Sequence, residues 1–459
     1  MKVLKKNTVS FRLRVPARAS LFYALAGLIS RGLGLIFTPI FTRALSAGDY
    51  GIYALFLGWE TIFSAFATLE IGSGAIFCGF ARFSGREGDF LKSAFFALIL
   101  AFSVLALPVG FIIWRVSGLD LALIALMAVS VLCDAVSSLY LTYKRYSYKF
   151  VTVFIFNTLP AVFMPLLSLI LIKKSPYFAR PLGYFVLSVI SLLAVLILWR
   201  WRGKKDGDMV RYTLVSCLAI LPGFLSSTVL TSADRLIIGA RLGAEAVAKY
   251  SVAHSLGLAL TFFTAGIYGA LKPWITRKLK GGEDSVVWRV CGKILSLGAV
   301  GTLLLASLAP ELFRVLAPIG YSEALSEVFP LALAVLPMFL ASVYSSVLTY
   351  FGRGWLVSAV SIGVAAVSLA LNLLLVGRFS YTVSALVFLI SYVLLAAVLG
   401  YLENGKIRGA LSIFFVCGFG VLALYLLKDD FYARLFCLIP LLILGFFAVK
   451  SLIKEVKEA

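Results

Sequence analysis

The sequence is short of charge and of histidine. Only 14% of its 459 residues are Asp, Glu, Lys or Arg, and His254 is the one histidine. With 61% hydrophobic residues and a mean hydropathy of +1.02, this scarcity of charge excludes an ordinary soluble domain. A single histidine also gives little support to a histidine-based metal centre or a Ser-His-Asp catalytic arrangement. The composition therefore favours a membrane protein over a soluble enzyme.

Cysteine is scarce as well. The six cysteines include no Cys-x-x-Cys pair, and most lie in or beside apolar segments. This spacing argues against a metal site or a disulfide framework, and we expect buried, unreactive thiols. The residues concerned are Cys78, Cys133, Cys217, Cys291, Cys417 and Cys437.

Long polar loops are missing, whereas apolar segments recur as far as the C-terminus. Each segment has about 20 residues or more, enough to cross ~30 Å of hydrocarbon as an α-helix. The sequence thus predicts an all-α polytopic membrane protein with about 14 transmembrane helices, the first retained rather than cleaved as a signal peptide. The predicted spans are residues 20–43, 50–80, 91–114, 121–143, 150–172, 178–199, 212–240, 248–272, 290–313, 325–351, 355–376, 381–402, 409–427 and 431–449.

Lysine and arginine are distributed unevenly between the two sides of this arrangement. With the N-terminus placed in the cytoplasm, the cytoplasmic loops and tails carry 29 of them and the opposite loops carry 11, while Arg31 and Arg235 lie inside spans. Because cytoplasmic loops are enriched in positive charge, we expect both termini in the cytoplasm and a location in the cell inner (cytoplasmic) membrane. The same topology accounts for the net charge of +21, so we expect no nucleic-acid partner.

The most polar internal segment, residues 200–211, follows the sixth span. It divides the chain into an N-lobe (1–205, spans 1–6), a C-lobe (206–403, spans 7–12) and a terminal helix pair with a basic tail (404–459). RALSAGDYGIY at 43–53 is similar to RLGAEAVAKY at 241–250, and SSLYLTYKR at 137–145 to SSVLTYFGR at 345–353. An even number of spans per lobe predicts parallel repeats in a pseudo-twofold arrangement, with the substrate site between them.

Residues 38–53 (TPIFTRALSAGDYGIY) resemble the first-turn signature of the O-antigen and related polysaccharide flippases, in the multidrug/oligosaccharidyl-lipid/polysaccharide exporter superfamily. Asp234, ahead of LGAEAVAKY at 242–250, fits the same pattern, as do two six-helix lobes with a terminal pair. The resemblance implies a transporter rather than an enzyme. It implies an alternating-access flippase that moves a polyprenyl diphosphate-linked oligosaccharide across the cytoplasmic membrane for surface polysaccharide assembly.

The resemblance implies ligands and partners too. These are the polyprenyl-linked glycan and membrane lipids, with other polysaccharide-assembly proteins as candidate partners. In this family the thirteenth and fourteenth spans would form a hydrophobic groove for the polyprenyl tail, and the alternative is a pair of helices that merely stabilises the bundle. We expect no cofactor or metal, and coupling to H⁺ or Na⁺ is the candidate energy source.

Two related functions stay open. Residues 30–34 (SRGLG) resemble the opening of the lipid II flippase motif, but Thr38 and Pro39 follow where that motif has an Arg-Asp pair. A lipid II flippase is therefore one alternative. A cation-coupled multidrug antiporter of the same fold is the other, although the acidic pattern usual in the early spans of such proteins is not evident.

Substrate binding is predicted for Arg31, Arg235, Asn157 and Asn372. A guanidinium inside a span costs roughly 3 kcal/mol on insertion scales, so Arg31 should face protein or water, where its fork of donors suits a diphosphate. The alternative for Arg31 is an ion pair with a carboxylate of span 2. Arg235 adjoins an aspartate and has the alternative of snorkelling to the surface, and the asparagines have that of interhelical hydrogen bonding.

Ion coupling is predicted for Glu60, Glu70, Asp134, Asp234 and His254. On one continuous helix, Glu60 and Glu70 would lie ~15 Å apart along the axis and ~80° apart around it. For His254 the alternative is a satisfied hydrogen bond between helices.

The sequence gives little support to an enzymatic function. Asp206-Gly-Asp208 matches the DxD pattern of some glycosyltransferases, but two solvated loop charges explain it as well. A membrane glycan polymerase or ligase would need a large extracytoplasmic loop, and the predicted loops are short. We therefore expect no catalytic residues.

Overall fold

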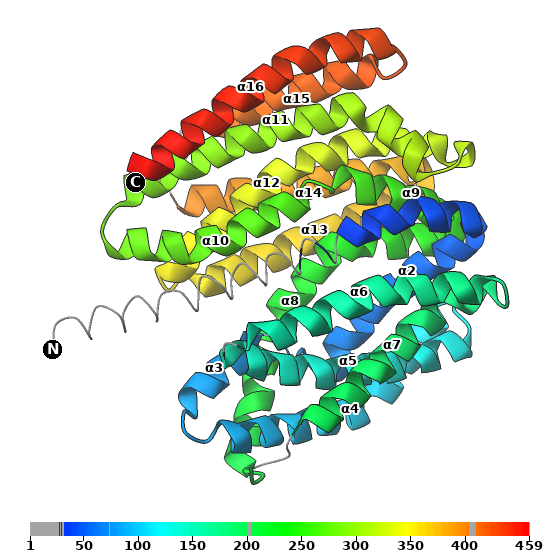
Figure 1. Cartoon of the computed structure of the whole chain (residues 1–459), viewed down its shortest axis with the longest axis vertical. Coiled ribbons are helices and arrows are strands. Elements are labelled where there is room, and N and C mark those ends of the chain that lie inside the picture. The colour runs from blue at the N-terminus through cyan, green and yellow to red at the C-terminus, as the bar shows by residue number, and fades with distance from the viewer. Residues whose placement is uncertain are drawn as a thin grey trace. The chain divides into compact units, whose positions relative to one another are not determined.

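The computed structural model describes residues 27, 29, 32–72, 74–147, 149–199, 203–403 and 410–458. Within these ranges every regular element is a helix, which confirms the all-α prediction (Figure 1). The helices are Gly32–Ala44, α2 (Ala47–Thr68), α3 (Gly74–Arg82), α4 (Glu87–Ser117), α5 (Leu121–Tyr146), α6 (Phe150–Ile172), α7 (Pro176–Leu198), α8 (Gly207–Leu242), α9 (Ala244–Gly257), α10 (Thr261–Lys280), α11 (Asp284–Leu316), η1 (Ile319–Ala324), α12 (Leu325–Tyr350), α13 (Gly354–Phe379), α14 (Thr382–Leu402), α15 (Ala410–Leu426) and α16 (Phe431–Glu458).

The helices reproduce the predicted spans. In the described part of the chain, 11 helices are long and apolar enough to cross a membrane, and α9 with α10 makes a bent twelfth span. Gly32–Ala44 and α15 are shorter apolar helices. Each of the fourteen predicted ranges therefore contains a helix, as expected of a multi-pass membrane protein.

The chain forms two compact units. The first comprises Met1–Phe37 and Ile52–Thr228, and the second comprises Thr38–Gly51 and Val229–Ala459. The predicted lobe boundaries at residues 205 and 403, and the pseudo-twofold relation of the lobes, stay predictions.

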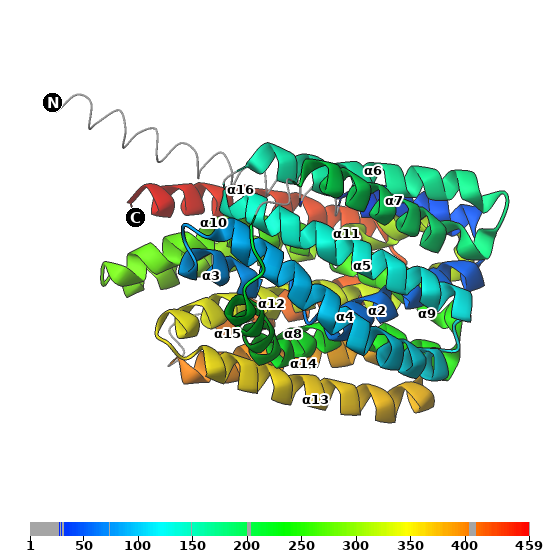
Figure 2. The same cartoon turned by 90° about the horizontal axis from the view of Figure 1, so that it is seen from below.

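In the first unit, α5 is the central helix. It packs against α3, α4, α6 and α7, and it lies between α4 on one side and the α6–α7 pair on the other (Figure 2). Its buried face is largely apolar and includes Leu123, Met127, Val131 and Leu139. Burial of this face against four helices fixes the position of the polar residues that α5 also carries.

In the second unit, α12 has the corresponding place, packed against α9, α10, α11, α13, α14 and α15. The terminal pair α15–α16 lies alongside α11 (Figure 1). Arg434 of α16 is 3% exposed and donates to both carboxylate oxygens of Glu311 in α11, at 2.6 and 2.7 Å, and to the Ser307 carbonyl at 2.7 Å. A bidentate ion pair thus holds the terminal pair to the unit.

Span 50–80 is broken. The structure divides it into α2 and α3, and Leu69 and Glu70 between them have φ values of 50° and 52°. This left-handed region costs an L-residue about 1–2 kcal/mol, and it ends the right-handed helix. The prediction that one helix carries both Glu60 and Glu70 is therefore wrong, and so is the separation calculated from it.

The backbone at this break is hydrogen-bonded to α5. The Gly72 carbonyl, just ahead of α3, accepts from the hydroxyls of Thr142 at 2.8 Å and Ser138 at 3.2 Å. A β-carbon on Gly72 would lie 2.8 Å from the Ser138 hydroxyl, so only glycine permits this approach. The hydroxyls of Thr142 and Ser138 thus supply the hydrogen bonds that a carbonyl in an unbroken helix would accept from a backbone N–H.

Span 248–272 is bent by 49° between α9 and α10. The second half is again tied to the central helix, because the Tyr268 hydroxyl donates to the Ser342 carbonyl of α12 at 3.0 Å and shares a hydrogen bond with the Ser346 hydroxyl. Spans 2 and 8 occupy equivalent places in the predicted six-span repeat. Interrupted spans at equivalent places are typical of transporters in which substrate binds near the interruption.

Candidate functional site

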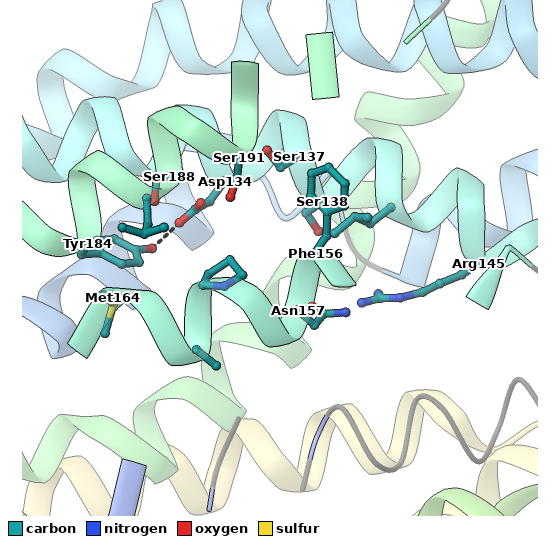
Figure 3. A pocket seen from close by; sticks show the side chains of 14 residues that line it. Asp134, Ser137, Ser138, Arg145, Phe156, Asn157, Met164, Tyr184, Ser188 and Ser191 are labelled. Carbon is teal, nitrogen blue, oxygen red and sulfur yellow. Dashed lines mark hydrogen bonds between the residues drawn. The ribbon is translucent and has the colours of Figure 1, made fainter. Parts of the chain in front are cut away.

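A polar cavity of about 300 Å³ lies between α5, α6 and α7 in the first unit (Figure 3). This volume is at the lower end of the range for small-molecule sites. Two of the predicted site residues, Asp134 and Asn157, line it. The complete lining is Asp134, Ser137, Ser138, Leu141, Arg145, Phe156, Asn157, Pro160, Ala161, Met164, Tyr184, Leu187, Ser188 and Ser191.

One end of the cavity is acidic. The Tyr184 hydroxyl of α7 lies within hydrogen-bonding distance of Asp134 Oδ2 in α5 and 3.1 Å from Glu60 Oε1 in α2. A phenol has one hydrogen, so it donates to only one of the two carboxyl groups. The other contact is a hydrogen bond only when that carboxyl carries a proton. In the cluster of Glu60, Tyr184 and Asp134, here called the acidic triad, one added proton would therefore complete the second hydrogen bond.

The other end of the cavity is basic. Arg145, in the last turn of α5, points toward Asn157 of α6 (Figure 3). The Asn157 side chain also donates to the Val153 carbonyl at 2.8 Å, which fixes its orientation. Arginine remains charged and binds phosphate oxygens through its fork of donors. The cavity thus offers a carboxyl-rich end and a guanidinium end along the same wall of α5.

Two prolines shape the wall formed by α6. Pro160 and Pro165 lack the N–H groups that would bond the carbonyls four residues earlier, those of Phe156 and Ala161. Both of these residues line the cavity. These two carbonyls therefore lack the usual helical donor, and α6 departs from regular helical hydrogen bonding at the wall of the cavity.

The face of α7 beyond the cavity carries a second arginine. The Arg180 guanidinium lies 3.7 Å from the centre of the Tyr53 ring, one turn before Tyr184. A cation held over an aromatic ring at this distance is stabilised by the ring quadrupole. Arg145, Arg180 and Tyr184 were not predicted from the sequence as site residues.

A second buried polar cluster lies in the second unit. Asp234 of α8 is 4% exposed, and its Oδ2 accepts from the Tyr250 hydroxyl of α9 at 2.5 Å. The neighbouring Arg235 donates from its backbone to Asp234 Oδ1 at 2.8 Å and from its side chain to the Thr231 carbonyl at 3.3 Å. The His254 ring lies beside that of Tyr250, with centroids 5.8 Å apart and the ring planes tilted by 49°. Three predicted residues, Asp234, Arg235 and His254, are thus neighbours.

The remaining predicted residues lie elsewhere. Arg31 is outside the described residues. Glu70 lies at the break between α2 and α3 and does not line the cavity. Asn372 of α13 is buried, donates to the Ser368 carbonyl at 3.0 Å and accepts from the Ser384 hydroxyl of α14 at 2.9 Å. This is an interhelical hydrogen bond of the kind given as its alternative, and its substrate role stays a prediction.

The DxD pattern lies in a structured loop. Asp206 accepts from Arg86 at 3.0 Å and from the backbone N–H of Asp208 at 3.0 Å, and its own N–H donates to Ser93. The Arg86 hydrogen bond is the main cause that lowers the pKa of Asp206 from its ordinary value of 3.8. Across the part of the chain that the structure describes, no group of three or more His, Cys, Asp or Glu residues is placed to hold a metal ion.

The fold is that of known exporters. The chain is similar to the lipid II flippase MurJ in an inward closed conformation, with a TM-score of 0.70 and 13% sequence identity over 95% of this chain and 99% of that one. It is also similar to an inward-facing MATE family multidrug resistance transporter of the MOP superfamily (TM-score 0.57, 13% identity, 85% and 99% covered). A MOP superfamily transporter from Pyrococcus furiosus matches with a TM-score of 0.54 at 14% identity, over 86% and 97%.

These similarities establish the fold. No curated protein matches the chain. Residues 17–278, more than half of the chain, match the family model described as "Polysaccharide biosynthesis protein". The chain is therefore a multi-pass membrane protein that belongs to the polysaccharide biosynthesis protein family, with the fold of MOP superfamily transporters.

Proposed function

We propose that the protein is a flippase that moves a polyprenyl diphosphate-linked oligosaccharide across the cytoplasmic membrane by alternating access, for surface polysaccharide assembly. The observation that carries this proposal is the polar cavity, with a cation at one end and a carboxyl cluster at the other, inside an otherwise apolar helix bundle. A membrane bundle gains nothing in stability from such a cavity, whereas a polar head group that crosses the membrane needs one.

Different parts of the cavity suit the different parts of such a substrate. Arg145 binds the diphosphate, and Arg31 and Arg235 stay predicted contacts of the substrate. Serine hydroxyls that line the cavity donate hydrogen bonds to the sugars and accept hydrogen bonds from them. Each of these contacts replaces a hydrogen bond to water that the head group loses when it enters the membrane. Transport of this kind makes and breaks no covalent bond.

The acidic triad couples transport to a proton gradient. When the triad loses its exchangeable proton, one hydrogen bond is lost and two like charges lie on either side of Tyr184. The ionised and protonated forms therefore favour different packing of α2 against α5 and α7. Asp234 and His254 are a second candidate for ion coupling, in the other unit. Both termini are cytoplasmic in this proposal, and other polysaccharide-assembly proteins are its partners.

Complementation of a flippase-null strain tests the substrate role of Arg145. We expect Arg145→Ala to abolish surface glycan and Arg145→Lys to restore only part of it, because lysine keeps the charge but not the bidentate geometry. Lys144→Ala is the matched control, since Lys144 is the adjacent cation but stacks on the Tyr140 ring at 4.6 Å and does not line the cavity. Normal surface glycan in Arg145→Ala would remove that residue from the mechanism. The same strain tests Arg31→Ala and Arg31→Lys.

A multidrug antiporter is the second candidate function. The contact of two carboxyl groups, Glu60 and Asp134, with one tyrosine favours it, because such a cluster also suits an organic cation. A drug-susceptibility panel with and without the gene separates the two functions. Drug resistance without a glycan phenotype would replace the flippase proposal.

A further inference from the structure

An apolar groove of about 760 Å³ runs along the α6–α7 pair in the first unit. Most of its side chains are exposed in the isolated protein, including Leu159 at 48% and Ile190 at 52%. The groove is lined by Ile155, Phe156, Leu159, Pro160, Phe163, Leu166, Leu167, Ile170, Leu187, Ile190, Ser191, Ala194 and Leu198. With a single serine among thirteen residues, it suits a hydrocarbon chain and not a polar group.

The groove and the polar cavity share a wall. Phe156, Pro160, Leu187 and Ser191 line both of them. These four residues form the seam between α6 and α7, with α5 and the cavity on one side and the apolar groove on the other. A molecule with a polar head and an apolar tail would have both parts accommodated across this one seam.

The two helices are held together at one end and connected separately at the other. Residues 173–175 join them directly, and a β-carbon on Gly183 would lie 2.3 Å from the Ser168 hydroxyl, so the helices nearly touch there. Away from this contact, α6 begins after α5 and α7 leads to α8. Pro160 interrupts the hydrogen bonding of α6 beside the seam, which is where a helix bends most readily.

We infer that the α6–α7 groove holds the isoprenoid tail of the lipid-linked substrate while its diphosphate and sugars occupy the adjoining cavity. The inference rests on the proposed function and adds the place of the tail and the seam through which the head group enters. It differs from the expectation drawn from the family resemblance, in which α15 and α16 hold the tail. A cavity between the start of α11 and the helices α15 and α16 has a charged lining, in which Arg289 pairs with Glu455 at 3.4 Å.

Photocrosslinking of the tail tests this placement. The probe is a polyprenyl diphosphate sugar with a diazirine in its isoprenoid chain, added to the full-length protein in phospholipid nanodiscs. We expect adducts within residues 155–170 and 187–198, displaced by unlabelled polyprenyl diphosphate sugar and not by phosphatidylglycerol. Adducts confined to α15 and α16 would overturn the inference. Equal displacement by phosphatidylglycerol would also overturn it, because the groove would then be ordinary lipid-facing surface.

Groove-filling variants give a second measurement. Leu159→Trp and Ile190→Trp place a large side chain in the groove and should reduce probe labelling about tenfold, because the indole sterically excludes the tail from the groove. Leu107→Trp on α4 is the matched control, because Leu107 is 81% exposed and does not line the groove. Labelling of the two groove variants at the control level would contradict the placement.

Flipping measured in vesicles with the wild-type protein keeps the two proposals separate. Wild-type flipping together with adducts only on α15 and α16 retains the proposed function and rejects the tail site. Absence of flipping rejects the proposed function. In that case, adducts on α6 and α7 with the expected competition still establish an isoprenoid-binding groove.

Discussion

Replacing Tyr184 with phenylalanine removes the one oxygen that joins Glu60 to Asp134. The Tyr184 hydroxyl contacts carboxyl oxygens of both residues, at 3.1 Å in the case of Glu60. The ring packs edge-on against Phe56, with centroids 6.3 Å apart, and phenylalanine preserves that packing. The substitution therefore separates the shared hydrogen bonds from the shape of the site.

The size of the effect follows from counting hydrogens. With both carboxyls ionised, Tyr184 donates to one of them, and the second contact contains no hydrogen. With one carboxyl protonated, both contacts are hydrogen bonds, so protonation gains one hydrogen bond between two neutral groups, the carboxylic acid and the phenol. Such a bond contributes about 0.5–1.5 kcal/mol, which corresponds to between about twofold and tenfold in the ratio of protonated to ionised triad. Tyr184→Phe loses this contribution.

Flipping of a fluorescent lipid-linked oligosaccharide in proteoliposomes, with and without an imposed pH gradient, measures the loss. We expect the gradient to stimulate the wild-type protein and not Tyr184→Phe, with similar thermal unfolding of both. Tyr143→Phe is the control, because Tyr143 undergoes the same change in the same unit but packs against Phe80 and does not line the cavity. Equal stimulation of Tyr184→Phe and wild type would refute the assignment of the exchangeable proton to the triad.

Three further predictions concern the break, a buried ion pair and an exposed one. Glu70→Gly relieves the left-handed backbone strain at residue 70 and should raise the free energy of unfolding by about 1 kcal/mol. Transport should fall in the same variant if Glu70 couples an ion. An unchanged free energy of unfolding would argue against strain at this position. Arg434→Met should lower that free energy by about 2 kcal/mol in detergent unfolding, because it leaves the carboxylate of Glu311, which is 33% exposed, without its partner. Adding Glu311→Met should recover most of the loss, and a double variant no more stable than Arg434→Met would contradict this explanation. Because its arginine partner lowers the pKa of Asp206, this residue stabilises the fold above its ordinary pKa of 3.8 and loses that contribution as the pH falls through the lower folded value. Asp206→Asn should therefore flatten the dependence of the unfolding midpoint on pH below 3.8, and an unaltered acid profile would contradict this.

The helices were predictable because membrane insertion imposes a simple requirement. Each span must be long and apolar, so hydropathy alone placed a helix in all fourteen ranges. The break in span 50–80 was not predictable on this basis. Residues 69–73 (LEIGS) are apolar or small except for Glu70, and hydropathy does not distinguish a left-handed turn from a helical one.

The site was predictable only in part. Asp134 and Asn157 drew attention as polar residues in apolar segments, and both line the cavity. Arg145 did not draw attention, because it lies just after the predicted span 121–143 and was counted among the loop charges that determine the topology. Tyr184 is one of 20 tyrosines, and nothing in its local sequence separates it from those at membrane interfaces. Its partners come from α2 and α5, so only the packing of three helices reveals it.

The break in span 2 lies between two different ties to α5. On the α2 side, Glu60 reaches Asp134 of α5 through Tyr184; on the α3 side, the Gly72 carbonyl accepts from Ser138. Asp134 and Ser138 are one turn apart on α5 and both line the cavity. The first tie depends on an exchangeable proton, whereas a hydroxyl-to-carbonyl bond does not titrate in the physiological range. In the proposed coupling, loss of the proton weakens the first tie and leaves the second unchanged, while the apolar contacts of Phe56 and Phe63 with α5 remain. We therefore expect the left-handed turn between α2 and α3 to act as the hinge at which a change in the cavity becomes a change in helix angle.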